Sequence, residues 1–307
     1  MPNDSTTDDS TLDDTALDDG VLRAELRAAG GRGEVAAVRR LDGGFAAGAW
    51  QVSFTDGTRV VAKVLADAPG DLFTLEAEGL EVLDSAGRLP VPEVLRVTSR
   101  LLLLGELPAR DDSESAWEAF AVALAGLHTA TGSERFGWDH DGYLGLLRQE
   151  NSWTADGHTF FAERRLLRYL REPRVDRALT AADRRALERF CDRLPDVIPV
   201  MPAVLTHGDL WSGNVLGHPS GGLAVIDPAV SFTWAEVDLS MLWSCPRPPA
   251  SDRFFEVYQE LNPSPPGWEK RMPLLNLREL LSVTASEDHA PWAVRRIRET
   301  LAPFYTR

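Results

Sequence analysis

The sequence predicts an α+β fold in two lobes, a small β-rich lobe followed by a larger, mainly helical lobe. Residues 40–65 alternate apolar and polar side chains around an Asp-Gly turn, a pattern typical of a β-hairpin. Beyond residue 113, several segments space their apolar residues as amphipathic helices do. A polar, turn-rich stretch at residues 105–113 separates the two regions, so we place the boundary between residues 105 and 106.

The first 20 residues form an acidic segment that we expect to be disordered. They carry seven aspartates and no basic residue, and a composition so poor in apolar residues cannot bury a core. An acidic docking arm is the alternative interpretation. The whole chain of 307 residues has a formal net charge of -15, which argues against a nucleic-acid partner because phosphate binding needs a basic surface.

The sequence predicts neither a secretory signal nor a membrane span. The start of the chain lacks a basic segment followed by an apolar run, and no stretch reaches the roughly 18 apolar residues that cross a membrane. Cys191 and Cys245 are the only cysteines, so we expect no disulfide framework and no cysteine-based metal site. These features together predict a cytoplasmic protein.

The expected elements follow the hydrophobic spacing along the chain. In the first lobe, residues 21–105, Asp56-Gly57 is a hairpin turn signal. In the second lobe, residues 106–307, helical patterns alternate with short apolar runs typical of strands. In chain order we expect a helix in residues 21–39, a hairpin in 40–65, a helix over 71–87, one or two strands in 94–104, helices over 115–127, 160–170 and 181–194, strands at 204–205 and 223–226, and the last helices after residue 237.

Two segments of the second lobe carry residues suited to phosphoryl transfer. The segment His207–Asn214 contains Asp209 and, five positions later, Asn214, while Asp227 follows the apolar run of residues 223–226. The reaction needs a carboxylate that accepts the proton of the attacking hydroxyl, and oxygen ligands that hold Mg²⁺ on the nucleotide phosphates. The order Asp, Asn, strand-end Asp is that of the kinase signature. We therefore expect Asp209 to be the base and Asn214 and Asp227 to bind magnesium.

Each segment also has a purely structural interpretation. Asp209 and Asn214 could shape a turn, and Asp227, which precedes Pro228, could cap a helix. The presence of both segments at this spacing, after a suitable amino-terminal half, favours the catalytic interpretation.

Lysine is rare in this chain, because Lys63 and Lys270 are the only lysines among 32 basic residues. Lys63 lies in the second strand of the predicted hairpin, where kinases place a lysine that holds the nucleotide phosphates and pairs with a helix glutamate. We expect Glu76 to be that partner, with Glu78 as the alternative. A surface lysine is the structural interpretation.

A glycine-containing loop precedes this hairpin. Gly43, Gly44 and Gly48 would let the backbone approach the phosphates closely. The stretch GGFAAG does not match the protein-kinase GxGxxG pattern, so a plain turn is the alternative.

Polar and aromatic residues flank the catalytic segments. We expect His207 to be structural rather than a general base, and Asp238 to cap the following helix or brace the catalytic loop. Trp211 lies two positions from Asp209, so it is either a core residue or a residue that contacts the substrate. Trp234 and Glu236 are further candidates for substrate contact, Glu236 as part of an acidic acceptor pocket.

These residues together resemble the fructosamine kinase branch of the aminoglycoside phosphotransferase superfamily, whose members have a protein-kinase-like two-lobed fold. HGDLWSGNVL and AVIDPAVSFTWAEVDLSMLW carry the most specific similarity. FTLEAEGLEVL, LAGLHTATGSERFGWDHDGYLG and QENSWTADGHTFFAERRLLRYL resemble further family segments, so that the similarity spans roughly residues 40–245.

The resemblance implies ATP- and Mg²⁺-dependent phosphorylation of a sugar hydroxyl on a ketosamine, such as a fructosamine or ribulosamine adduct of an amine. It assigns the base to Asp209, the metal ligands to Asn214 and Asp227, and a contact with the sugar to Trp211. The backbone near Leu104 and Glu106 would receive the adenine. The expected partner is a small glycated amine, and the chain would be a monomer or a weak homodimer.

The sequence departs from the family in two places. The glycine loop lacks the cysteine that lets many members form a redox-sensitive disulfide between subunits, so that regulation is not expected. The segment LLNLRELLSVTASEDHAPW lacks the usual Asn-His and glycine-aromatic pattern that helps to close the acceptor site. An aminoglycoside or another hydroxylated metabolite is therefore an alternative acceptor, with Glu236, Glu287 and Asp288 as candidate acidic contacts. A catalytically silent nucleotide-binding scaffold is a further alternative.

Overall fold

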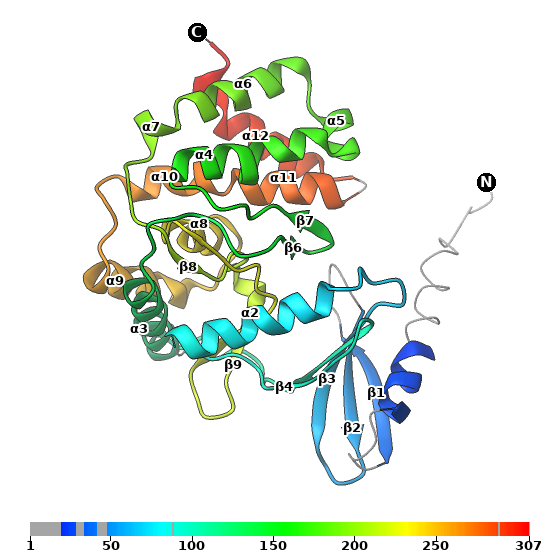
Figure 1. The fold of residues 1–307 in the computed structure, drawn as a ribbon. Helices are drawn as coiled ribbons and strands as arrows, with labels where there is room; N and C mark the ends of the chain where they lie inside the picture. Colours follow the sequence, from blue (N-terminus) through cyan, green and yellow to red (C-terminus); the bar gives the residue numbers. More distant parts are fainter. Residues whose placement is uncertain (1–19, 29–33, 42–47, 88, 288, 307) are drawn as a thin grey trace, which may run out of the picture. The chain divides into compact units, whose positions relative to one another are not determined.

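The computed structural model describes residues 20–28, 34–41, 48–87, 89–287 and 289–306 (Figure 1). The acidic tail of residues 1–19, the loop glycines Gly43 and Gly44, and Asp288 lie outside the described residues. The chain divides into two compact units. The N-unit comprises the chain up to Glu78 together with Pro92–Leu107, and the C-unit comprises Gly79–Val91 together with the chain from Pro108 onward.

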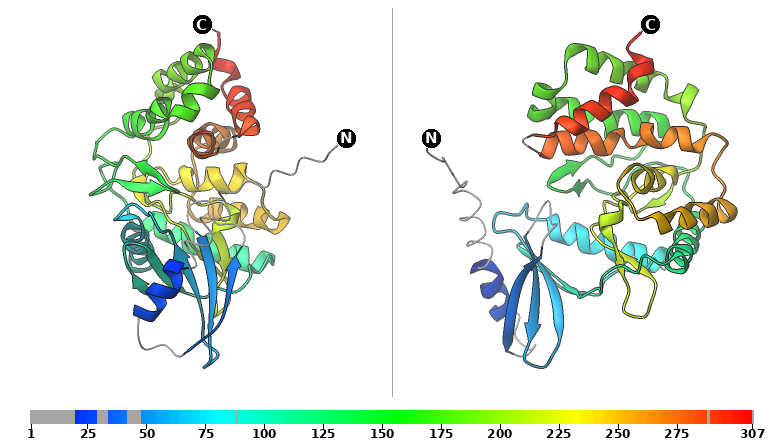
Figure 2. Two further views of the ribbon diagram at one scale, coloured as in Figure 1. Left: turned by 90° about the vertical axis from the view of Figure 1, so that its right-hand side faces the viewer. Right: turned by 180° about the vertical axis from the view of Figure 1, so that it is seen from behind.

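The N-unit is built on a five-stranded antiparallel sheet in the order β1-β2-β3-β5-β4. The predicted hairpin is present, because the Asp56 carboxylate accepts the Thr58 backbone N–H at 2.8 Å and Gly57 has a φ of 86°. A helix of residues 20–28 lies against the sheet, and its Leu22 belongs to the sheet's apolar core (Figure 2). The strands are β1 (Val35–Leu41), β2 (Gly48–Phe54), β3 (Arg59–Val64), β4 (Val94–Val97) and β5 (Leu101–Gly105), and helix α2 (Leu72–Gly87) begins in this unit.

The C-unit is mainly helical, as the sequence predicts, with three short two-stranded sheets. Helices α11 and α12 lie side by side near its carboxyl end (Figure 1). The helices are α3 (Glu114–Ala130), α4 (Gly157–Phe160), α5 (Pro173–Ala178), α6 (Ala181–Asp192), α7 (Leu194–Val197), α8 (Glu236–Ser244), α9 (Asp252–Leu261), α10 (Trp268–Leu275), α11 (Leu277–Ser286) and α12 (Pro291–Thr300), and the strand pairs are β6 (Gly142–Leu144) with β7 (Leu147–Gln149), β8 (Val204–Thr206) with β11 (Ser231–Thr233), and β9 (Val215–Gly217) with β10 (Leu223–Val225).

The helix expected over residues 160–170 is not one regular α-helix. After α4 the chain forms a π-helical segment, Phe161–Leu166, and then a 3₁₀ segment, Leu167–Arg171. Arg165 points inward from the π segment and donates to the Glu150 carbonyl and to Asn151 Oδ1, each at 2.6 Å. Single π turns are rare and often occur at functional sites. Hydrophobic spacing alone cannot distinguish this change of helical pitch.

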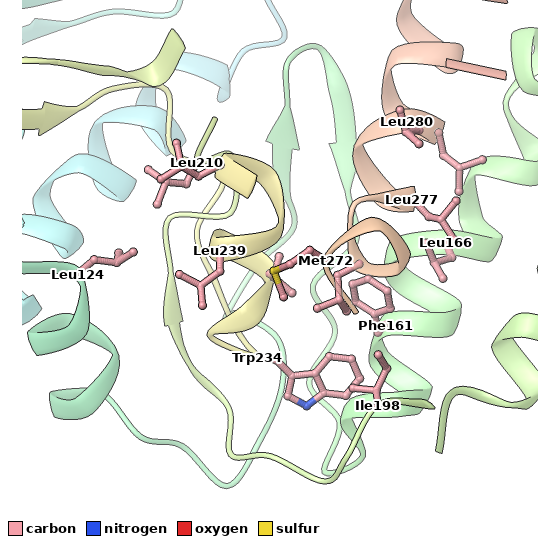
Figure 3. Close-up of a cluster of buried hydrophobic side chains, with 14 of the residues drawn as sticks. Leu124, Phe161, Leu166, Ile198, Leu210, Trp234, Leu239, Met272, Leu277 and Leu280 are labelled. Atoms are coloured by element: carbon pink, nitrogen blue, oxygen red, sulfur yellow. The ribbon is translucent and has the colours of Figure 1, made fainter. Parts of the chain in front are cut away.

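One continuous apolar core holds the helices of the C-unit together. Figure 3 shows side chains from several of these helices converging, among them Leu124 of α3, Leu239 of α8, Met272 of α10 and Leu277 of α11. Burial of such side chains contributes about 1.5–3 kcal/mol each. This core positions the helices and loops that carry the polar residues described below.

Asp183 in the first turn of α6 is expected to make the stability of the protein dependent on acidic pH. It forms a capping box with Thr180 and also accepts hydrogen bonds from Arg298 at 2.9 Å and from the Tyr305 hydroxyl at 2.5 Å. Burial raises the pKa of the Asp183 carboxyl, but these hydrogen bonds outweigh it and hold the pKa well below its usual value. A lowered folded-state pKa stabilises the fold above the unfolded pKa, and this stabilisation is lost as the pH falls toward the folded value.

We therefore expect Asp183→Asn to lower the free energy of unfolding at pH 7 by about 1.5–3 kcal/mol, the range for hydrogen bonds to charged groups. The difference from wild type should shrink steadily below about pH 4, near the ordinary aspartate pKa. Urea denaturation at several pH values measures both effects. Asp192→Asn, an exposed position on the same helix, is the control, and a difference for Asp183→Asn that does not change with pH would contradict the assignment.

Candidate active site

The loop after β8 has a backbone that only glycine permits at its second position. Gly208 has a φ of 80°, and a Cβ at this position would lie 2.1 Å from the Ala229 carbonyl oxygen. This close approach brings the loop against the chain that follows β10. The chain then presents Asp209 and turns through the 3₁₀ segment Ser212–Asn214 into β9.

Asn214 is held by hydrogen bonds that orient its amide group. Its Nδ2 donates to the Asp209 carbonyl at 2.8 Å and to Asp209 Oδ2 at 3.0 Å. Because the amide nitrogen points to Asp209, the Oδ1 atom is the group that remains suited to bind a metal ion.

Asp227 lies two residues after the end of β10, and the residues on both sides of it are hydrogen-bonded to the same loop. The Ile226 N–H donates to the Asn214 carbonyl at 3.0 Å, and the Ala229 N–H donates to the His207 carbonyl at 2.8 Å. Asp227 has a φ of 58° and is the only non-glycine residue with positive φ in the described part of the chain. Aspartate tolerates this left-handed conformation better than most residues. The two separate segments that carry Asp209 and Asp227 are therefore neighbours in the C-unit.

A buried ion pair is present in the N-unit. Lys63 Nζ in β3 lies 2.5 Å from Glu76 Oε1 in α2, and both side chains are at least 85% buried. Glu76, the expected partner, accepts a hydrogen bond from Lys63 Nζ. Lys63 is therefore not an exposed surface lysine.

Comparison with known proteins decides the family. Residues 22–301 match the model of the fructosamine kinase family, which covers nearly the whole chain. The chain belongs to the fructosamine kinase family. This result confirms the resemblance found in the sequence and identifies a small-molecule kinase.

Individual relatives of this fructosamine kinase family member agree with the assignment. The chain is 33% identical over 227 residues to a probable ketoamine kinase from Synechocystis, covering 69% of this chain and 72% of the relative. It is 32% identical over 260 residues to the probable ketoamine kinase YniA from Escherichia coli, covering 82% and 87%. The structure matches a Thermobifida fusca protein assigned as a fructosamine-3-kinase with a TM-score of 0.79 and 36% identity, covering 91% of this chain and 98% of that one.

The fold class is confirmed by more distant structures. An aminoglycoside phosphotransferase, APH(4)-Ia, solved with ADP and hygromycin B, aligns with a TM-score of 0.61 at 18% identity, covering 92% of this chain and 98% of that chain. At this identity the likeness concerns the fold alone, and the fold is that of protein-kinase-like phosphotransferases.

His207 of this family member is oriented by two hydrogen bonds that define its tautomer. Its Nδ1 accepts the Asp209 backbone N–H at 3.1 Å, so Nε2 carries the proton and donates to the Ile226 carbonyl at 3.0 Å. Burial lowers the pKa of the imidazole below its ordinary value, which keeps it neutral. Both ring nitrogens are occupied by the backbone, as the expected structural role requires.

Asp238 in α8 holds the backbone of the loop His207–Asn214. Its two carboxylate oxygens accept the backbone N–H groups of His207 and Gly208, each at 2.8 Å, and Oδ2 also contacts His128 Nε2 at 3.2 Å. Burial raises the pKa of Asp238, but the hydrogen bond from His128 and the other partners lower it overall. Of the two roles considered for Asp238, these contacts correspond to the loop brace, since no side chain caps α8.

The surroundings of Asp209 are strongly charged. Burial raises the pKa of its carboxyl well above the ordinary value, Glu279 raises it further, and Arg278 opposes the increase. Glu279 and Arg278 were not among the residues expected from the sequence. The signal that could have revealed them is an adjacent charged pair inside the apolar helix sequence LNLRELL of α11.

Two of the expected substrate contacts lie in the interior. Trp234 is 1% exposed and packs edge-to-face on Phe136 and obliquely on Phe161, within the core shown in Figure 3. Glu236 is also 1% exposed, and Arg271 Nε donates to its Oε2 at 2.7 Å. This packing argues against a substrate contact for either residue and corrects that expectation, because both are fully engaged with the protein.

The remaining expected site residues lie as follows. Trp211 is partly exposed beside Asp209, with its ring packed against Gly213. Gly48 begins β2, and Leu104 lies in β5. Glu106 follows β5, and its carboxylate pairs with Arg59 at 2.7 Å.

The donor chemistry of the site fits magnesium better than a metal that needs a cage of protein ligands. Within the described ranges, no three or more His, Cys, Asp or Glu side chains are grouped as a metal site. Mg²⁺ usually binds one or two protein oxygens and completes its shell with phosphates and water. Asn214 and Asp227, whose segments are joined by the hydrogen bond from Ile226 N–H to the Asn214 carbonyl, are the candidates for such a pair. The same described residues contain no helix with the length and apolar character of a membrane span.

Proposed function

We propose that this family member transfers the γ-phosphate of ATP to a sugar hydroxyl of a ketosamine, such as a fructosamine or ribulosamine adduct of an amine. Loss of the phosphorylated sugar would then free the amine. The observation that carries the proposal is the tie between the Asp209 loop and the Asp227 segment in a chain of this family. Further support comes from the relatives, which include probable ketoamine kinases and, at 28% identity, a protein-ribulosamine 3-kinase from rice.

In this proposal Asp209 accepts the proton of the acceptor hydroxyl, and the partly exposed Trp211 contacts the sugar. Asn214 and Asp227 hold Mg²⁺, which neutralises phosphate charge when it is bound. His207 and Asp238 keep the loop backbone in place and take no proton from the substrate. Without a bound ligand, burial raises the pKa of the Asp209 carboxyl. A cation bound nearby would lower this pKa, because positive charge stabilises the ionised carboxylate.

We assign nucleotide contacts to the first lobe, residues 21–105, and catalysis with acceptor binding to residues 106–307. Lys63, oriented by Glu76, would bind the phosphates, and the glycine loop with Gly43, Gly44 and Gly48 would lie close to them. The backbone at Leu104 and Glu106 would bind the adenine. The need for ATP favours a cytoplasmic location. The proposed partner is a small glycated amine, and the proposed oligomeric state is a monomer or a weak homodimer.

The test is magnesium-dependent ADP formation across a panel of fructosamines, ribulosamines, free sugars and aminoglycosides. We expect kcat/KM for the best ketosamine to exceed that for the matching free sugar by about 100-fold or more, since remote binding energy accelerates the reacting end. If the protein phosphorylates aminoglycosides but no ketosamine, the acceptor is an aminoglycoside and the ketosamine assignment is wrong. Nucleotide binding with no turnover of any compound would favour a silent scaffold.

A further inference from the structure

Two arginines from outside the catalytic loop bind the backbone carbonyl groups at its two ends. Arg278 in α11 donates through Nη1 to the carbonyl of Gly208, the residue before Asp209. Arg110, in the segment before α3, donates through Nη1 to the carbonyl of Ser212 and at 3.4 Å to that of Val215. These two carbonyls flank Asn214. Asp209 therefore directly follows a carbonyl held by one guanidinium, and Asn214 lies between two carbonyls held by the other.

The Arg278 contact continues to the segment that carries Asp227. Arg278 is 2% exposed, and its Nη2 donates to Gln149 Oε1 at 2.6 Å. Gln149 is 4% exposed and donates through Nε2 to the Ala229 carbonyl at 3.1 Å. A chain of hydrogen bonds thus joins Gly208 to Ala229 through two buried side chains. It relates the peptide before Asp209 to the backbone two residues after Asp227.

Arg110 is itself held in place for its contact with the other end of the loop. Its Nε donates to Asp112 Oδ1 at 2.6 Å, and its guanidinium lies 5.8 Å from the Trp117 ring centroid. An arginine anchored in this way loses less side-chain freedom when it binds a carbonyl group.

Burial of a guanidinium is unfavourable unless it forms good hydrogen bonds. Charge-assisted hydrogen bonds are about twice as strong as neutral ones, and the rigid fork of arginine can bind two acceptors at once. Nη1 and Nη2 of Arg278 donate to the Gly208 carbonyl and to Gln149 Oε1 rather than to a carboxylate, and Nη1 also lies 3.8 Å from Met241 Sδ.

We propose that Arg278 and Arg110 are positioning residues for phosphoryl transfer, Arg278 acting on Asp209 and Arg110 on Asn214. The inference rests on the proposed roles of those two residues. Neither arginine touches the reacting atoms, and each acts through the loop backbone. Since a displacement of about 1 Å can reduce a rate 100-fold, the loss of either contact should reach the chemical step.

The test uses Arg278→Ala, Arg278→Lys and Arg110→Ala in the full chain, with any acceptor of the panel that wild type phosphorylates. We expect Arg278→Ala to lower kcat by about 10- to 100-fold with KM for ATP nearly unchanged, and Arg278→Lys to lie between it and wild type. Arg110→Ala should raise the magnesium concentration for half-maximal rate by about tenfold, the effect of one lost charge-assisted contact. Millimolar guanidinium chloride should restore part of kcat to Arg278→Ala, and should lower the magnesium requirement of Arg110→Ala, each in a saturable manner.

Arg189→Ala is the matched control, because Arg189 also binds two backbone carbonyls, those of Phe304 and Tyr305, at 2.6 and 3.1 Å. Its kcat should equal that of wild type and should not respond to guanidinium. A folded Arg278→Ala variant with wild-type kcat would overturn the inference, as would guanidinium that restores thermal stability but not rate.

If Arg278→Ala does not fold, Gln149→Leu is measured instead. A loss of kcat of about tenfold would support the inference, and an unchanged kcat would contradict it. The variants are assayed with whichever acceptor the wild type phosphorylates. If the ketosamine assignment is wrong, the wild type will prefer another acceptor in the panel. If the positioning role is wrong, the variants will keep the wild-type kcat with that acceptor.

Discussion

Replacement of Asp209 by asparagine should abolish phosphoryl transfer while leaving the affinity for ATP nearly unchanged. Asparagine has the same shape but cannot accept the proton of the attacking hydroxyl, and a positioned general base typically contributes about 100- to 10,000-fold to a rate. The loop should keep its geometry, because an amide oxygen at position 209 can still accept the hydrogen bond that Asn214 Nδ2 makes at 3.0 Å. We expect kcat to fall by that factor and KM for ATP to change little.

Steady-state kinetics with the best acceptor measures the rate, and calorimetric titration of ATP in the presence of magnesium measures the affinity. Asp192→Asn, the exposed substitution on α6, makes the same chemical change away from the loop and should behave as wild type. An Asp209→Asn variant that turns over within a few-fold of wild type would remove Asp209 as the base. A variant that loses ATP binding would instead place Asp209 among the nucleotide or metal contacts.

Asp227→Asn is expected to weaken the binding of ATP only when magnesium is present. Loss of one carboxylate ligand should raise the Kd for MgATP by about 10- to 100-fold, since Mg²⁺ prefers charged oxygen donors and has few protein ligands here. Asparagine is the right substitution because residue 227 has a φ of 58°, and asparagine tolerates this left-handed backbone. Alanine would add backbone strain of about 1 kcal/mol and confuse the loss of a ligand with a loss of stability.

ATP titrations with magnesium and with excess chelator separate the metal-dependent part of the affinity. Wild type should bind more tightly with magnesium, whereas Asp227→Asn should show nearly equal affinity in both conditions. Asp227→Gly, which suits the same backbone and also lacks the carboxylate, should reproduce the result. Equal magnesium dependence in wild type and in both variants would exclude Asp227 as a metal ligand.

Local patterns in the sequence predicted much of what the structure contains. The Asp56-Gly57 turn and its alternating neighbours predicted the hairpin of β2 and β3, which is present. The apolar spacing of residues 71–87 predicted a helix, and helix α2 (Leu72–Gly87) is present. Such features are readable because turn chemistry and backbone conformation depend on a few neighbouring residues.

Other positions were misjudged because their environment comes from distant parts of the chain. Trp234 and Glu236 follow the catalytic segments closely in sequence, yet their side chains turn into the core and toward Arg271. The segment Phe161–Leu166 has the apolar spacing of an α-helix, but it is π-helical in the structure. Its Arg165 side chain is directed into the interior, where it donates to the Glu150 carbonyl. Sequence proximity to a motif therefore does not establish which way a side chain points.

The sequence by itself determined the fold class, the family and which polar side chains are candidates for phosphoryl transfer, because these depend on local residue types and their spacing. Only the tertiary structure decided how the catalytic loop is held. Arg278 lies 70 positions after Gly208, Gln149 lies 129 positions before Arg278, and Arg110 lies 102 positions before Ser212. Hydrogen bonds over such separations depend on the packing of α11 and of the segment before α3 around one core, and no periodicity along the chain records that packing.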